Sequence, residues 1–78
     1  MQLQQFIQRF REEFEYLEED EVVDGSTEFQ KIDGWDSLTA IMILEMIDDE
    51  FEADISGDEL RACTTIEELY NLSKERAA

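Results

Sequence analysis

A serine beside an aspartate is the part of this sequence best placed to do chemistry. A long polar stretch of the sequence ends, and an apolar, periodic one begins, at five consecutive residues: Gly34, Trp35, Asp36, Ser37 and Leu38. A hydroxyl at the start of a helix can cap that helix, act as a nucleophile, or carry a phosphodiester, because the helix dipole and free N–H groups favour an anion there. The other residues of the sequence indicate which of these three roles Ser37 has.

The nucleophile role fails for want of a base. The five residues resemble a Gly-Asp-Ser-Leu esterase motif with Trp35 inserted, but the chain contains no histidine to activate the serine hydroxyl. No Gly-x-Ser-x-Gly elbow is present either. We therefore expect no catalytic residue and no enzymatic activity of the chain's own. A simple cap at Ser37 stays open, although its capping-box partner is missing, since Ala40 stands three residues on.

Metal binding is also a poor fit to the spacing of the acidic residues. A calcium site could be expected from the cluster of five acidic residues Asp48, Asp49, Glu50, Glu52 and Asp54. An EF-hand loop needs ligands at alternate positions, a glycine at the sixth and a glutamate at the twelfth, and no window satisfies this. Cys63 is the only cysteine, so neither a disulfide framework nor a Cys-based zinc site is expected. We predict no metal site, with Cys63 a small buried residue between two helices.

Charge and length narrow the class of protein further. The 78 residues suffice for one domain, which we place at residues 1–78, and the formal net charge is −16. Such a field repels nucleic acid and anionic lipid and attracts proteins with Lys/Arg patches. Because there is no apolar run of membrane-spanning length, we expect no membrane insertion. The lack of a disulfide framework favours a reduced, cytoplasmic setting, and we expect a monomer.

The hydrophobic pattern predicts an all-α fold. Apolar residues three and four apart indicate a helix over residues 3–17, and a second apolar, periodic segment covers residues 38–51. Capping boxes at Ser56–Glu59 and Thr65–Glu68 predict a short third helix through residue 62 and a last helix after it. The result is a four-helix bundle with a long loop between the first and second helices. From that loop we expect four apolar side chains to tuck inward, namely Val22, Val23, Phe29 and Ile32.

The second helix has an apolar face where a polar one is expected. Residues at 100° intervals place its core stripe at Ala40, Ile43, Leu44, Ile47 and Phe51. Opposite this stripe lie Leu38, Met42 and Met46, bordered by Glu45, Asp48 and Asp49. An apolar strip with an acidic border suits transient docking of a basic partner, and methionine suits several partners. The alternative is a central helix buried on most sides, which applies most to Met46.

The Asp36-Ser37-Leu38 triplet opens this acidic helix after a long loop, in a helical chain of this length. In this the chain resembles the acyl carrier protein family, which includes peptidyl and aryl carriers. The resemblance runs from Phe6 to Leu72. It includes three further segments: Thr27-Glu28-Phe29, Asp49-Glu50-Phe51 and Thr64-Thr65-Ile66-Glu67-Glu68-Leu69.

The resemblance implies a cofactor and a set of roles. A phosphopantetheinyl transferase would attach 4′-phosphopantetheine to Ser37, with Asp36 helping to position the transferase's metal ion and the incoming phosphate. The arm's thiol would hold acyl groups as thioesters, which the space between the second and third helices would shelter. Other partners would be acyl-activating and acyl-transferring enzymes with basic docking surfaces. The family's docking positions correspond here to Leu38, Ile41, Met42, Glu45, Asp48 and Asp49.

Four positions depart from carriers of fatty acid synthesis. Trp35 stands where a small residue is common, Thr39 and Met42 where acids are common, and Glu45 where methionine is common. A carrier for a specialised acyl or polyketide-type pathway is thus as well supported as a fatty acid carrier. A peptidyl or aryl carrier and an acidic mimic of nucleic acid remain as alternatives. We interpret Trp35 as an anchor that fixes the long loop to the bundle.

Overall fold

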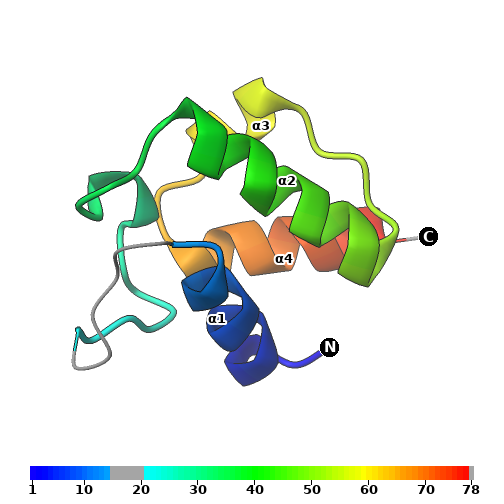
Figure 1. Ribbon diagram of the computed structural model, residues 1–78. Coiled ribbons are helices and arrows are strands. Elements are labelled where there is room, and N and C mark those ends of the chain that lie inside the picture. Colours follow the sequence, from blue (N-terminus) through cyan, green and yellow to red (C-terminus); the bar gives the residue numbers. More distant parts are fainter. Residues whose placement is uncertain (15–20, 78) are drawn as a thin grey trace.

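The computed structural model describes residues 1–14 and 21–77, which form a small helical bundle (Figure 1). Its elements in chain order are α1 (Leu3–Glu12), the 3-10 turn η1 (Phe29–Lys31), α2 (Ser37–Phe51), α3 (Gly57–Ala62) and α4 (Ile66–Arg76). Over these described ranges the chain forms no β-strand, only an isolated bridge between Glu28 and Thr65. The predicted all-α fold with its short third helix is confirmed.

α1 is shorter than its sequence pattern predicts. The helix ends at Glu12, and the last turn tightens through bonds from the Glu13 and Phe14 N–H groups to carbonyls three residues back. Phe14 nevertheless remains buried, as its place in the apolar stripe predicted. Arg9 and Glu13, one helical turn apart, form an ion pair at 4.0 Å. The predicted continuation to Leu17 lies outside the described residues.

An aromatic cluster joins the helices at the centre of the bundle. The Phe6 ring lies 5.4 Å from Tyr70 of α4 and 5.9 Å from Phe51 of α2, centre to centre. Phe10 continues the cluster toward the loop, where its ring is 5.7 Å from Phe29. These separations are those of favourable tilted and edge-on aromatic pairs. The cluster fixes α1 against both long helices.

The connection before α2 is held to the start of α4. The Ile66 N–H donates to the Thr27 carbonyl at 3.1 Å, and the Glu67 N–H donates to the Gly25 carbonyl at 2.9 Å. These bonds satisfy first-turn N–H groups that a helix cannot pair internally. One prediction for this connection is wrong, because Val22 is 80% exposed. Only the loop segment after it packs inward.

That inward packing is deepest at Phe29. Its side chain is fully buried, as predicted, while Val23 and Ile32 are partly buried against the core. The segment from residue 21 to residue 36 therefore follows the surface of the bundle and brings its end to the start of α2 (Figure 1).

Candidate functional site

Asp36, rather than Ser37, caps α2. The Asp36 backbone is extended, and its Oδ1 accepts a hydrogen bond of 2.8 Å from the Thr39 N–H. That bond from the Thr39 backbone lowers the pKa of the Asp36 carboxyl below its usual value, so the group is ionised at neutral pH. Ser37 is the first helical residue and is exposed. No hydrogen bond of its hydroxyl is found within the described residues, so the cap interpretation of Ser37 is wrong.

Trp35 anchors this start of α2 to the core. Its ring is stacked with Phe10 at 6.5 Å and 2° between planes, and lies 5.2 Å from Phe29 and 6.0 Å from Phe14. The backbone before it turns at Gly34. Its φ of 97° is an angle that residues with a side chain rarely adopt. The anchor role predicted for Trp35 is confirmed. Packing on one side and the turn on the other fix where Ser37 emerges.

A groove of about 440 Å³ begins at Ser37 and runs between α2 and α3. Its α2 wall carries Ala40, Ile41 and Leu44, and Leu60 of α3 faces them. The resemblance to acyl carrier proteins implied a space between the second and third helices that shelters the acyl group, and the groove lies there. Its volume is within the range of ligand-binding clefts.

Two polar residues that sequence reasoning missed also line this groove, Gln30 of η1 and Arg61 of α3. Neither belongs to a motif. The one available signal was that Arg61 is the only basic residue between Lys31 and Lys74.

The predicted docking residues do lie together on the outer side of α2. Leu38 is 64% exposed and Ile41 is 53% exposed, which is unusual for large apolar side chains in a small domain. Met42 is half-buried, where it lines a small hollow beside Leu38 and Phe14. Three acidic side chains continue the same helix and are all exposed: Glu45, Asp48 and Asp49.

The inner face of α2 is turned relative to the prediction. Met46, expected to face water, is only 2% exposed, and Thr39 is also buried. Ala40 and Leu44, expected in the core, are half-buried and line the groove instead. The reason is that α2 packs against α1, α3 and α4, so neighbours cover more of its circumference than a single stripe. The buried-helix alternative holds for Met46.

Other candidate sites offer less. In the part of the chain that the structure describes, no three His, Cys, Asp or Glu side chains gather as a metal ion would require. Cys63 is buried between α3 and α4, as predicted, and burial raises the pKa of its thiol. Of the helices in the described ranges, none is long and apolar enough to cross a membrane.

Comparison with known families decides the class of this site. The family described as "Phosphopantetheine attachment site" matches residues 4–72. The chain belongs to this family. It is therefore a phosphopantetheine-bearing carrier domain, and 4′-phosphopantetheine is its covalent cofactor. Searches of the curated proteins and of the solved structures give no match.

The geometry at Ser37 fits the family's cofactor. The phosphopantetheine attachment family needs a hydroxyl that another protein can reach and room for the arm beside it. Ser37 is exposed at the positive end of α2, and the groove opens next to it. Because Asp36 already caps the helix, esterification of Ser37 would cost α2 no capping bond.

Proposed function

We propose that Ser37 is the attachment residue and that the protein carries acyl groups without catalysing their reactions. The observation that supports this best is the division of roles at the start of α2. Asp36 makes the capping bond to Thr39, while the Ser37 hydroxyl next to it is exposed. A serine with no structural task at that position is free to be modified.

The chemistry of attachment balances simply. The Ser37 Oγ forms a bond to phosphorus as a P–O bond in the pyrophosphate of coenzyme A breaks. Adenosine 3′,5′-bisphosphate leaves, and the hydroxyl proton is lost. When bound, the cofactor supplies a thiol that holds an acyl group as a thioester. The chain's own contribution is to present Ser37 and to fix it in place through Trp35. Asp36, which is ionised, would in this proposal help to position the transferase's metal ion and the incoming phosphate.

Partner enzymes dock, in this proposal, on the outer face of α2. Leu38 and Ile41 supply exposed apolar area beside Ser37, and Met42 extends it. Glu45, Asp48 and Asp49 make no ion pair within the described residues, so their charge is available to a basic groove on a phosphopantetheinyl transferase or an acyl-transferring enzyme. The pathway we propose is fatty acid synthesis or a specialised acyl or polyketide-type route. A peptidyl or aryl carrier is the alternative.

Intact-protein mass spectrometry tests the proposal directly. The apo protein is incubated with coenzyme A, Mg²⁺ and a broad-specificity phosphopantetheinyl transferase. We expect a gain of one phosphopantetheine, lost in Ser37→Ala. The matched control is Ser26→Ala, which removes an exposed loop hydroxyl bonded to Asp24 and should load normally. Loading that persists in Ser37→Ala, or is absent from the unmodified sequence, would overturn the assignment.

A further inference from the structure

The groove beside Ser37 is apolar along most of its length but contains one cation. Its walls are formed by Trp35, Ala40, Ile41, Leu44 and Leu60. From Ser37 to Leu44 the α2 wall advances by seven residue steps, a rise of roughly 10 Å. Arg61 is the one basic side chain among the described residues that line it. A lone guanidinium in such a place suggests an anionic ligand.

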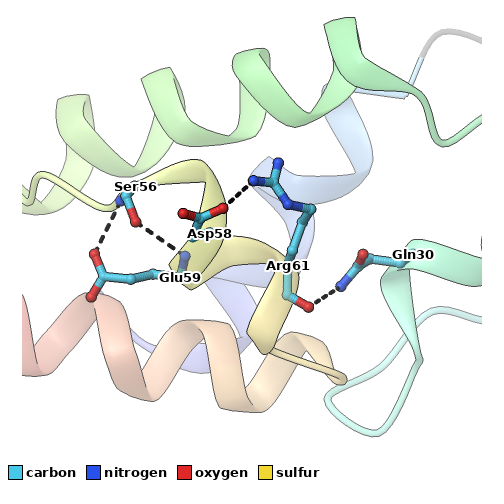
Figure 2. Close-up of polar contacts among 5 residues, drawn as sticks. All are labelled: Gln30, Ser56, Asp58, Glu59 and Arg61. Carbon is cyan, nitrogen blue, oxygen red and sulfur yellow. Dashed lines mark hydrogen bonds and ion pairs between the residues drawn. The ribbon is translucent and has the colours of Figure 1, made fainter.

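Arg61 reaches the groove from the end of α3. Figure 2 shows its side chain extending from α3 toward α2. A Cβ at Gly57 would meet Arg61 Nη1 at 3.3 Å, so the guanidinium lies directly over that glycine. Gly57 thus leaves room for the guanidinium at the edge of the groove.

The present partner of Arg61 holds it weakly. Arg61 pairs with Asp58 of the same helix, and the two side chains are 67% and 91% exposed. Exposed pairs of this kind contribute little, because water and salt screen them. A pair of phosphate oxygens matches the planar fork of a guanidinium, as a carboxylate does. Moving Arg61 from Asp58 to a phosphate would therefore cost little.

Gln30 fixes the part of α3 from which Arg61 projects. Its Nε2 donates to the Arg61 carbonyl at 3.1 Å (Figure 2). The same Nε2 donates to the Cys63 carbonyl at 2.8 Å. Both amide hydrogens are thus used on the backbone at the end of α3. Because Gln30 belongs to η1, this ties the segment that leads into Asp36 and Ser37 to the helix carrying Arg61.

A phosphodiester attached to Ser37 would be stabilised by a nearby cation. Attachment at Ser37 would place a negative charge beside the ionised Asp36, in a chain whose formal charge is already −16. Three other basic residues are engaged elsewhere: Arg9 with Glu50, Lys31 with Glu28 and Arg76 with Glu59. Arg61 shares the groove with both Asp36 and Ser37.

We propose that Arg61 binds the phosphodiester of the arm attached to Ser37 and so seats the arm in the groove between α2 and α3. This rests on the proposed function, since the anion is the one that attachment creates. Seated in this way, the arm would lie against Ala40 and Ile41, which line the groove next to Ser37. An arm held at its phosphate explores fewer directions than one tethered only through the Ser37 oxygen.

Nuclear magnetic resonance of the apo and holo proteins tests this inference. We expect loading to shift the Nε–Hε resonance of Arg61 and to leave that of Arg76, which is paired with Glu59, nearly unchanged. The ³¹P resonance of the holo protein should then move in Arg61→Ala but not in Lys31→Ala. Lys31 is the matched control, because it removes the same charge from an exposed position outside the groove.

A spin label on the arm's thiol provides a second readout. Label mobility should rise in Arg61→Ala and should be intermediate in Arg61→Lys, which keeps the charge but loses the planar fork. Because the Arg61 side chain is exposed, both variants should fold, and the apo–holo comparison of the unmodified sequence needs no variant. If the holo protein forms but Arg61 and the ³¹P signal do not respond, the inference is wrong and the carrier function stands. If the mass spectrum shows no loading, both the assignment of Ser37 and the inference about Arg61 are wrong.

Discussion

The two ends of α2 present different chemistry to solvent. Residues 37–44 contain no charged side chain, and Leu38 and Ile41 are its exposed apolar groups. Residues 45–51 contain four acids and no base. The uncharged end lies beside Ser37 and the groove, and the acidic end lies two turns away along the same helix.

Helix stability does not explain the acidic end. Carboxylates near a helix C-terminus face the negative end of the helix dipole, which is unfavourable. The helix also closes on Glu52 with a φ of 53°, a left-handed conformation in which glycine is the usual residue. Among these acids, only Glu50 has an ion-pair partner in the part of the chain that the structure describes, Arg9 of α1. We infer a division of labour, with charge attracting a partner at one end and apolar side chains contacting it at the other.

Removing the apolar contact should have the largest effect on partner turnover. In Leu38→Ala with Ile41→Ala, kcat/KM of a phosphopantetheinyl transferase should fall about tenfold, the equivalent of roughly 1.4 kcal/mol of lost apolar contact. The thermal midpoint should barely change, because both side chains are exposed and alanine favours helix. Val22→Ala removes a still more exposed apolar side chain from the loop and is the control. An unchanged kcat/KM would show that the apolar end makes no contact.

Neutralising the acidic end should have a smaller effect. The association rate should fall, whereas the thermal stability should rise. Asp48→Asn with Asp49→Asn should slow association severalfold at low salt, with the difference lost at high salt, because exposed charges steer encounters. The same change should raise the thermal midpoint by roughly 2–6 °C by removing unfavourable dipole interactions.

The control for this pair is Glu12→Gln with Glu75→Gln, which changes the net charge equally on α1 and α4. Association that slows as much in the control would mean that total charge, and not the acidic end of α2, attracts the partner.

Two glutamates five residues apart on α2 should separate structural from functional charge. Glu50→Gln should lower the free energy of unfolding by about 0.5 kcal/mol, since Glu50 pairs with Arg9 across two helices. Glu45→Gln should leave the unfolding free energy unchanged and lower only the association rate. Urea unfolding and stopped-flow association measure the two quantities. Equal destabilisation by both changes would remove the distinction.

The smallest effect concerns pH at the uncharged end. The pKa of Asp36 is lower in the folded protein than its ordinary 3.8. Its contribution is therefore complete above that ordinary value and is lost as the pH falls through the lower folded value. Asp36→Asn keeps a capping acceptor that does not titrate. Its thermal midpoint should depend less on pH below 4 than that of the unmodified sequence, and parallel curves would contradict the role of this bond.

Local signals predicted the helices well because they need no distant partner. The Ser56–Glu59 and Thr65–Glu68 capping boxes are present, and α3 and α4 begin immediately after each cap residue. The start of α2 was missed by one residue, since a single aspartate cap carries no second signal at the third position. Periodicity gives the direction of a side chain but not how wide an arc its neighbours cover.

That limit explains the error at Met46, and Val22 was missed because a loop has no periodicity to show which side chains pack inward. It also explains why the groove was only half predicted. Its polar residues come from η1 and α3, and Gln30 and Arg61 are 31 residues apart in the chain. No spacing rule joins such positions. Ser37 and the outer face of α2 were accessible from sequence because they lie on one continuous helix.

Trp35 gives this protein an optical reporter of its own. It is the only tryptophan in the sequence, and its indole lies between the Phe10 and Phe29 rings on one side and the groove on the other. The emission of the indole therefore responds to whatever displaces water from the groove. Filling of the groove by the arm or its cargo can be followed in the unlabelled protein, at the concentrations of an enzyme assay and in real time.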